Sequence, residues 1–371
     1  MTLSRQELGR QLTAICDGHS VADPARMKVY ESDGLTAKKQ LPWLVLLPAD
    51  IPQVQAVMRL CHAHGIPVVA RGAGTGLSGG AMPHSDGVLL SLARLNRILE
   101  VDQANLLARI QPGVTNLAIS DHVRPLGLFY APDPSSQIAC TIGGNVAENS
   151  GGVHCLKYGL TVHNVRKLTL VSPAGELYDV GAEAFDAPGY DLLALLHGSE
   201  GMLGIVVEVT VKLLPLPAEI VVLLAAFHHV GEAAEAVGDI INQGIIPAGL
   251  EMMDQLAVQA AEAFVHADYP LDAAAILICE LDGSAAEVEA QQVLLTQVLT
   301  AAGAVLVRGA RDVEQRRRLW LGRKAAFPAV GRLAPDYYCM DGTIPRSQLA
   351  SVLAEISAFS VTYGLAVANV F

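Results

Sequence analysis

The stretch that decides the fold is Arg71-Gly72-Ala73-Gly74-Thr75-Gly76-Leu77-Ser78-Gly79-Gly80. Five glycines fall within nine of its positions, so the backbone can take positive φ angles and approach an anion without a clash at Cβ. Two short β-rich runs, 66–70 and 88–92, flank the stretch and predict a strand on either side of a loop. The favoured interpretation is a nest of backbone N–H groups for an anion, and a tight turn between strands is the alternative.

The segment Gly74–Gly79 also fits the G-x-G-x-x-G signature of dinucleotide-binding Rossmann domains. That site requires a helix to begin at the third glycine, with its N-terminus at the pyrophosphate. Here the residues 81–87, Ala-Met-Pro-His-Ser-Asp-Gly, interrupt any helix and lead into the second strand. The sequence therefore does not predict an NAD site.

Two further stretches are rich in glycine and small polar residues, 132–152 and 197–205. In the first, few side chains are large, so a flat ligand can approach closely and find hydroxyl and amide groups for hydrogen bonds. A long run without regular structure inside a compact domain is usually functional. A surface loop for the first stretch, and a β-bulge or turn for the second, are the alternatives.

The composition indicates a globular protein with room for two or three domains, because 51% of its 371 residues are hydrophobic. The formal net charge of −12 argues against nucleic acid or an anionic membrane surface as a partner. No apolar run approaches the ~18 residues that a membrane helix needs. The six cysteines are scattered, so neither a disulfide framework nor a zinc or iron–sulfur site is predicted. The N-terminus lacks the layout of a signal peptide, which predicts a cytoplasmic location.

A domain boundary is predicted at Pro215-Leu216-Pro217, which gives a first domain over residues 1–217 and a second over 218–371. In the second domain, strand-like runs alternate with helical runs, a pattern typical of an α+β layer. We expect a compact sheet there with helices on one face. The last apolar run, 366–371, predicts a strand.

The three glycine-rich stretches Arg71–Gly80, Pro132–Gly152 and His197–Glu208 together resemble the flavin-contacting segments of the FAD-linked oxidases of the vanillyl-alcohol-oxidase and p-cresol-methylhydroxylase type. Trp320–Ala329 and Asp336–Pro345 more closely resemble the 2-hydroxyacid branch, specifically the FAD-linked catalytic subunits of bacterial glycolate oxidase. The resemblance extends from about Arg26 to Phe371. It implies an α+β fold with a two-lobed FAD-binding domain followed by a cap domain.

The resemblance also implies which residues bind the cofactor. FAD is expected to be non-covalent, because no histidine lies within 71–80, where some relatives attach the flavin. The segment expected at the pyrophosphate comprises Arg71, Gly72, Ala73, Gly74, Thr75, Gly76, Leu77, Ser78 and Gly79. The residues expected along the flavin and ribityl chain are Pro132, Asp133, Ser135, Thr141, Gly143, Gly144, Asn145, Asn149 and Gly151. Ile205 is expected near the adenine.

A small 2-hydroxyacid needs a cation for its carboxylate, and Arg323 matches the carboxylate-binding arginine of the branch. A planar guanidinium can hold a carboxylate through two parallel hydrogen bonds, whereas a solvated basic helix face is the alternative. His154 follows the second flavin segment and is expected either to reach the substrate or to be structural. Tyr338 and Asp341 resemble the wall of the family's substrate pocket.

No catalytic base is predicted within the chain. In the 2-hydroxyacid branch, a His-x-Gly-Asp-Gly-Asn segment follows the strand that corresponds to 367–371 and supplies the base and, in several members, a metal ligand. The sequence ends at Phe371, so the base is expected beyond it, and a divalent metal is expected only in a longer chain. This predicts a truncated chain that keeps the FAD site, has little or no dehydrogenase activity and leaves a strand edge unpaired.

The function that the resemblance implies is oxidation of glycolate, or a related D-2-hydroxyacid, to the 2-oxoacid. Electrons would pass through the flavin to an iron–sulfur subunit and the quinone pool, and a second FAD-binding-type subunit is the other expected partner. The protein would then be cytoplasmic, or attached peripherally to the inner membrane through these partners. Two alternatives remain open, a D-lactate or D-2-hydroxyglutarate dehydrogenase and an inactive flavin-binding or assembly subunit.

Overall fold

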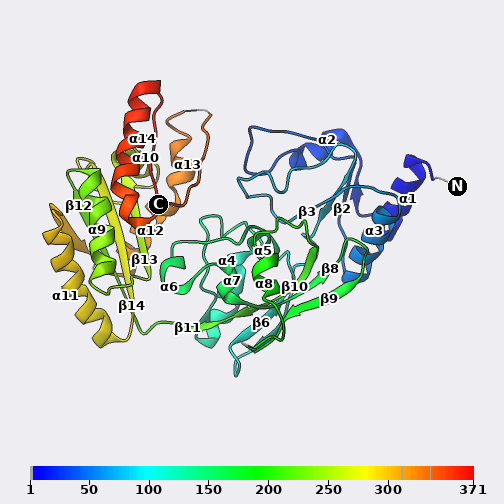
Figure 1. Ribbon diagram of the computed structural model, residues 1–371, viewed down its shortest axis with the longest axis horizontal. Helices are drawn as coiled ribbons and strands as arrows, with labels where there is room; N and C mark the ends of the chain where they lie inside the picture. Colours follow the sequence, from blue (N-terminus) through cyan, green and yellow to red (C-terminus); the bar gives the residue numbers. More distant parts are fainter. Residues whose placement is uncertain (1–2, 185, 311, 335) are drawn as a thin grey trace. The chain divides into compact units, whose positions relative to one another are not determined.

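The computed structural model describes residues 3–184, 186–310, 312–334 and 336–371, and the chain forms two compact units (Figure 1). The first unit comprises Met1–Gly152 and Tyr158–Leu216. The second comprises Pro217–Phe371 together with the short segment Val153–Lys157, which lies within the predicted first domain. Both units mix helices with sheets, so the predicted α+β class is confirmed.

The first unit begins with a small sheet in the order β1-β2-β4-β3. Its strands are β1 (Ser20–Val21), β2 (Leu44–Leu46), β3 (Val68–Arg71) and β4 (Val88–Ser91). The helix α3 (Ile51–Ala63) covers this sheet, as the spacing of its apolar residues predicts. Asp50 caps α3 by accepting the N–H of Gln53 at 2.9 Å, which fixes where the helix begins.

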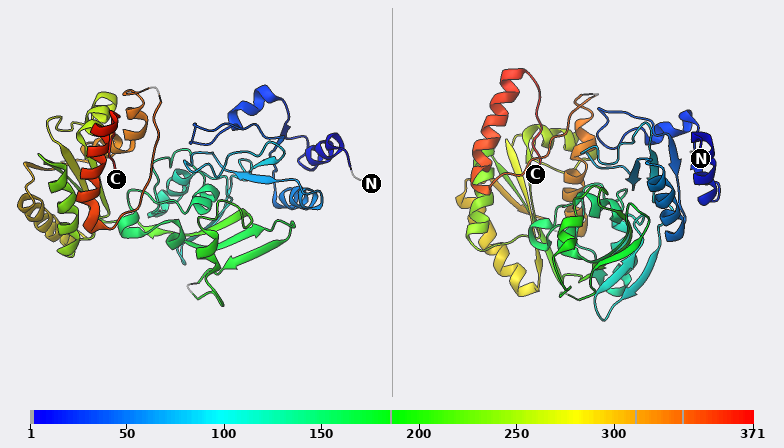
Figure 2. Two further views of the ribbon diagram at one scale, coloured as in Figure 1. Left: turned by 45° about the horizontal axis from the view of Figure 1, so that its top comes forward. Right: turned by 45° about the vertical axis from the view of Figure 1, so that its right-hand side comes forward.

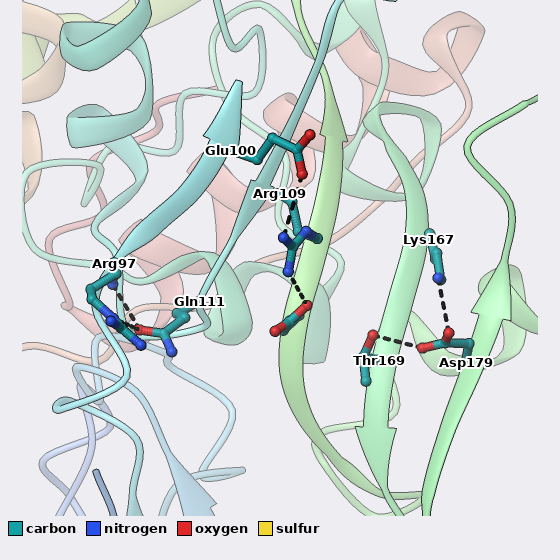
Figure 3. A network of polar contacts seen from close by, with 8 residues as sticks. Arg97, Glu100, Arg109, Gln111, Lys167, Thr169 and Asp179 are labelled. Carbon is teal, nitrogen blue, oxygen red and sulfur yellow. Dashed lines mark hydrogen bonds and ion pairs between the residues drawn. The ribbon is translucent and has the colours of Figure 1, made fainter. Parts of the chain in front are cut away.

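A second sheet in the first unit is antiparallel, in the order β5-β6-β10-β8-β9. Its strands are β5 (Ile98–Asp102), β6 (Leu107–Ile110), β8 (Val165–Val171), β9 (Leu177–Gly181) and β10 (Ile205–Lys212). Apolar residues from these strands pack with α4 (Asn116–Val123) and α5 (Ile142–Glu148) into one core. The polar side chains of the sheet form ion pairs and hydrogen bonds between neighbouring strands. Arg109 pairs with Glu100 and Glu208, and Asp179 accepts from Lys167 and Thr169 (Figure 3).

The remaining elements up to residue 216 are short. They are α1 (Arg5–Ile15), α2 (Pro24–Met27), η1 (Lys28–Tyr30), η2 (Arg124–Leu126), β7 (Leu128–Phe129), α6 (Cys155–Tyr158), α7 (Thr161–Asn164), α8 (Leu192–Leu196) and β11 (Leu214–Pro215). The strands β7 and β11 pair antiparallel and form a two-stranded sheet.

The second unit is built on one antiparallel sheet, in the order β13-β14-β12-β15 (Figure 2). Its strands are β12 (Glu219–Phe227), β13 (Gly249–Asp254), β14 (Ala275–Gly283) and β15 (Leu306–Gly309). One face packs against α9 (Val230–Asn242), α11 (Ala285–Ala301) and α14 (Leu349–Tyr363). The other face packs against α10 (Gln255–Val265), α12 (Val313–Lys324) and α13 (Ala326–Val330). A short turn of helix, η3 (Arg346–Gln348), precedes α14.

The prediction of helices on only one face of this sheet is therefore wrong. Along β12, Leu223, Ala225 and Phe227 belong to one apolar core, whereas Val222 and Leu224 belong to the other. Successive side chains of a strand point to opposite faces, so a continuously apolar strand is covered on both sides. The run Ile220–Phe227 carried this signal in the sequence.

The end of the chain lies beside β13. Val370 forms an antiparallel bridge with Met253, and the backbones of Met252 and Phe371 exchange hydrogen bonds of 2.7 and 3.1 Å. Asn369 donates to the Asp254 carboxylate through its backbone N–H, at 2.7 Å. Strand-like pairing of the predicted run 366–371 is thus confined to its last residues, and these cover the edge that β13 would otherwise present. Within the part of the chain that the structure describes, no helix has both the length and the apolar character to cross a bilayer.

Candidate functional site

The glycine-rich loop leaves β3 at Arg71 with its backbone N–H groups exposed to a ligand. Among the described residues, none of the N–H groups from Gly72 to Gly79 donates a hydrogen bond to another group of the protein. Gly74 and Gly79 have φ angles of +72° and +83°, a conformation that side chains disfavour. Backbone N–H groups without partners are costly unless water or a ligand accepts from them. The loop therefore has the character of the predicted anion nest.

Arg71 holds the base of this loop in place. Its guanidinium is buried and donates to the carbonyl oxygen of Ser32 at 2.8 Å, while it also lies over the ring of Tyr30. A Cβ atom at Gly74 would lie 2.3 Å from the guanidinium, so only glycine allows the loop to close over it. Burial lowers the pKa of Arg71, and the nearby Asp33 carboxylate opposes this shift. Arg71 thus contributes a fixed positive charge at the point where the loop begins.

The second glycine-rich stretch lies against the first. A Cβ atom at Gly72 would lie 2.2 Å from Oγ1 of Thr141, the residue that caps the N-terminus of α5. At the other end of α5, Ser78 donates from its hydroxyl to Glu148 Oε2 at 3.1 Å. The loop therefore approaches both ends of α5: it passes close to Thr141 at the start of the helix and is hydrogen-bonded to Glu148 at its end.

The third stretch lies against the C-terminal half of α5. Gly198 donates its N–H to the carbonyl of Val146 at 3.0 Å, and Glu200 donates its N–H to the carbonyl of Ala147 at 2.9 Å. A Cβ atom at Gly80 would lie 2.7 Å from Glu200 Oε2. The structure thus brings all three predicted flavin segments together around one short helix of the first unit.

The helix α5 itself is a correction to the sequence analysis, which treats 132–152 as a run without regular structure. Gly143 and Gly144 lower the helical propensity of this segment and conceal it. The signal that could have revealed it is Thr141, whose side chain accepts the N–H of Gly144, together with Asn149, which ends the helix with φ of +49°.

The structure places the remaining predicted cofactor residues as follows. Pro132 and Asp133 are buried, and the Pro132 carbonyl accepts from Asn116 at 3.0 Å. Asn145 is buried and accepts from the same Asn116 amide, whereas Ser135 is exposed. Ile205 has its side chain in an apolar core of the first unit. Its contact with adenine stays a prediction.

Glu148 is an ionisable group at the loop that the sequence analysis did not single out. Burial raises the pKa of its carboxyl group above the ordinary value. The hydrogen bond from Ser78 opposes this shift, whereas the neighbouring Glu200 and Asp33 carboxylates add to it. Ionisation of Glu148 is therefore less favourable than that of a solvated glutamate, even before an anionic ligand enters the loop.

In the second unit, Arg323 and His154 lie on the same face of the sheet. Arg323 donates from Nε to Glu251 Oε2 at 2.5 Å, and His154 Nε2 lies 2.9 Å from Glu280 Oε1. Trp320 donates from its indole nitrogen to Glu280 Oε2 at 2.5 Å. The two candidates from the sequence, Arg323 and His154, thus contact two buried carboxylates that the sequence analysis did not identify.

The signal for Glu251 and Glu280 was present in the sequence. Each is a charged residue with an apolar neighbour on either side, inside the strand β13 or β14. A charge buried in this way is retained only with a partner, so each predicts a cation or donor on the facing helix or loop.

The other two substrate candidates lie elsewhere. Tyr338 is 69% exposed and Asp341 is exposed as well, both in an irregular stretch that precedes η3. Over the described ranges of the chain, no hydrogen bond or ion pair joins either residue to Arg323 or His154. Their place in a substrate pocket stays a prediction. Nor do three His, Cys, Asp or Glu side chains gather as metal ligands anywhere in those ranges.

Comparison with known proteins supplies the family. The FAD binding domain family matches residues 42–181, and the family described as FAD linked oxidases, C-terminal domain, matches residues 216–371. The glycolate oxidase subunit GlcD of Escherichia coli (strain K12) is 59% identical over 342 residues, which cover 92% of this chain and 68% of that protein. The chain belongs to the family of FAD-linked oxidases.

Two further comparisons place this FAD-linked oxidase within the family and its fold. A D-lactate dehydrogenase of Anaerostipes hadrus is 33% identical over 324 residues, which cover 85% of this chain and 68% of that protein. The solved structure of p-cresol methylhydroxylase with substrate bound superposes with a TM-score of 0.73 at 17% identity, over 88% of this chain and 71% of that chain. At that identity the likeness shows the fold alone, and it confirms the predicted p-cresol-methylhydroxylase type.

As a member of this family, the chain is an FAD-dependent oxidoreductase. The loop Gly72–Gly79 fits the cofactor, because its N–H groups, which have no acceptor among the residues that the structure describes, suit the two negative charges of a diphosphate. Backbone dipoles rather than surplus cations would then bind the phosphates, which agrees with a chain whose net charge is −12.

Replacing Gly72 by alanine tests the packing of the loop on α5. Because the new Cβ would lie 2.2 Å from Thr141 Oγ1, either this hydroxyl must leave the position in which it caps α5, or loop and helix must move apart. Each N–H contact to a charged group that is lost in this way costs ~1.5–3 kcal/mol. We expect the affinity for FAD to fall at least about 10-fold in a fluorescence titration of the FAD-stripped protein. Gly231→Ala, in the first turn of α9 with open space around it, is the control. Unchanged FAD affinity in Gly72→Ala would contradict this packing.

Replacing Glu148 by glutamine tests the electrostatics of the loop. The folded protein raises the pKa of Glu148, so its ionisation destabilises the fold progressively as the pH rises through that pKa. We expect Glu148→Gln to unfold at a higher temperature than the parent at pH 7, with the difference disappearing as the pH falls to about 4. Thermal unfolding at several pH values measures this. A variant that is less stable at pH 7 would show that the ionised carboxylate is favourable there.

Proposed function

We propose that this FAD-linked oxidase oxidises glycolate to the 2-oxoacid. The glycolate oxidase subunit at 59% identity supports this substrate, and the cluster around Arg323 supports the class of substrate. FAD, bound non-covalently through the loop 72–79, supplies the acceptor for the hydride that leaves the substrate carbon.

The observation that carries the proposal is the pattern of hydrogen bonds at the Arg323 guanidinium. Its Nε is engaged by Glu251, whereas in the described part of the molecule neither Nη nitrogen has a partner. The side chain is only 15% exposed, so this pair of donors lies in a partly desolvated place where a charged hydrogen bond is strong. A guanidinium in this condition can bind one carboxylate through two parallel hydrogen bonds.

His154 is assigned to the substrate hydroxyl. It lies on the same sheet face as Arg323, and its Nε2 is oriented by Glu280. The helix α12 links the surroundings of Arg323 and His154, because its Trp320 donates to Glu280 and its Arg323 donates to Glu251. We assign the catalytic base to no residue of this chain.

The relative in Escherichia coli is named as a subunit, which supports partner subunits for this chain. We propose an iron–sulfur subunit as the electron acceptor and a second FAD-binding-type subunit as a further partner. Peripheral attachment to the inner membrane would follow through them. A flavin can pass its electrons one at a time to an iron–sulfur acceptor, and the described residues of this chain contain no cluster of metal-binding side chains of their own.

The proposal predicts that glycolate bleaches the yellow flavin of the complete, FAD-loaded protein under anaerobic conditions. Ethylene glycol, which lacks the carboxylate, should leave the flavin oxidised. Arg323→Ala should raise the glycolate concentration needed by about 100-fold, since two charged hydrogen bonds are lost. Arg317→Ala, an exposed arginine on the same helix, is the matched control and should behave as the parent.

Other outcomes would overturn the assignment. A flavin that stays oxidised with glycolate, D-lactate and D-2-hydroxyglutarate would indicate an inactive flavin-binding or assembly subunit. Bleaching by D-lactate alone would assign the function of the relative in Anaerostipes hadrus instead.

A further inference from the structure

Three buried carboxylates stand in a row on one face of the second unit's sheet. Glu251 of β13 and Glu280 and Asp282 of β14 are each 7% exposed. Gly249 is the register partner of Glu280, and residues two apart on a strand share a face, so all three point to the side that α12 covers. Burying three carboxylates is expensive, and each must be compensated by its own donors.

Each carboxylate has a different partner. Arg323 pairs with Glu251, whereas both His154 and Trp320 contact Glu280. Lys157 donates to the carboxylate and to the backbone carbonyl oxygen of Asp282. Arg323 and Trp320 are three residues apart on α12, so they project from the same side of that helix. His154 and Lys157 both come from the segment Val153–Lys157. Each of the two partners that are substrate candidates, Arg323 and His154, therefore contacts a buried carboxylate.

We propose that Glu251 and Glu280 are positioning residues, which hold Arg323 and His154 in the orientation that the substrate requires; this inference rests on the proposed function. An arginine side chain has several rotatable bonds, and a carboxylate on Nε fixes the plane of the guanidinium. The two Nη donors then point in one direction before any ligand arrives. Such preorganisation is what converts a mobile cation into a specific site.

Glu280 does the same for His154 through a different arrangement. One carboxylate oxygen accepts from the indole of Trp320, which fixes the carboxylate, and the other lies 2.9 Å from His154 Nε2. The ring of Trp320 also lies beside the imidazole, with centroids 6.2 Å apart. Glu280 on the sheet and Trp320 on α12 therefore both contribute to the orientation of the imidazole.

A double-mutant cycle separates positioning from a merely structural ion pair. Glu251→Ala should raise the KM for glycolate by about 10- to 100-fold while kcat changes less than about 3-fold, because only the orientation of the carboxylate grip is lost. In an Arg323→Ala background, Glu251→Ala should add no further rise in KM. The affinity for glyoxylate, measured by calorimetry on the FAD-loaded protein, should follow the same pattern.

Glu251→Gln keeps an oxygen that accepts from Nε and serves if the alanine variant does not fold. It should raise KM less than alanine does, and its effect should also vanish in the Arg323→Ala background. For Glu280, the cycle pairs Glu280→Gln with His154→Ala, and we expect the same loss of additivity in KM and kcat.

Asp282→Asn is the matched control. It breaks an ion pair of the same kind on the same sheet face, but its cation, Lys157, is not a substrate candidate. It should lower the unfolding temperature, leave KM unchanged and add to Arg323→Ala independently.

The outcomes distinguish this inference from the function on which it rests. If Arg323→Ala leaves KM unchanged, the proposed carboxylate site is wrong. If Arg323→Ala raises KM but Glu251→Ala acts additively or not at all, the carboxylate site stands and the positioning role is contradicted.

Discussion

The backbone N–H groups of residues 72–79 find no acceptor among the described residues of the protein, and this constraint governs how the first unit is built around the loop. Such groups are stable only when solvent or a ligand accepts from them, so the chain around them must keep the loop open and fixed. Arg71 fixes the start of the loop, and Thr141 and Ser78 fix it to the two ends of α5. The glycines at 72 and 74 are needed because any Cβ would collide with these supports.

The second unit meets a comparable constraint with side chains. On the face that α12 covers, its sheet carries three buried carboxylates, and each of these is compensated by a donor from α12 or from Val153–Lys157. An ion pair buried in this way is weak evidence for stability, since apolar replacements often fold equally well. The proposed importance of the arrangement lies in Arg323 and His154, which it holds, while the two Nη donors of Arg323 have no partner in the described part of the chain.

Much of this could be read from the sequence because local chemistry dictated it. The glycine loop, the helix α3 with its Asp50 cap, and the alternation of strands and helices after Pro217 each follow from nearby residues. Arg323 was identified only because the sequence around it resembles a known family. The structure places it beside Glu251, a carboxylate that no sequence motif indicated.

What the sequence analysis missed depends on contacts between distant residues. The helix α5 contains two glycines and is stabilised by packing of the loop and of Glu200 on it, which propensity does not register. The second layer of helices was missed because only one feature of the sequence indicates it, the uninterrupted apolar run of β12. A strand covered on a single face would alternate apolar and polar residues instead. Glu251 and Glu280 were missed because a lone carboxylate acquires a role only when its partner, 72 or 126 residues away, is known.

Hydrogen exchange of the backbone amides, with and without FAD, tests the central claim most directly. If the N–H groups of residues 72–79 bind the diphosphate, their exchange should slow by about 10-fold or more in the FAD-loaded protein, while the β5–β6 turn exchanges at the same rate in both states. Protection that appears elsewhere in the first unit, with unchanged exchange over 72–79, would contradict the account.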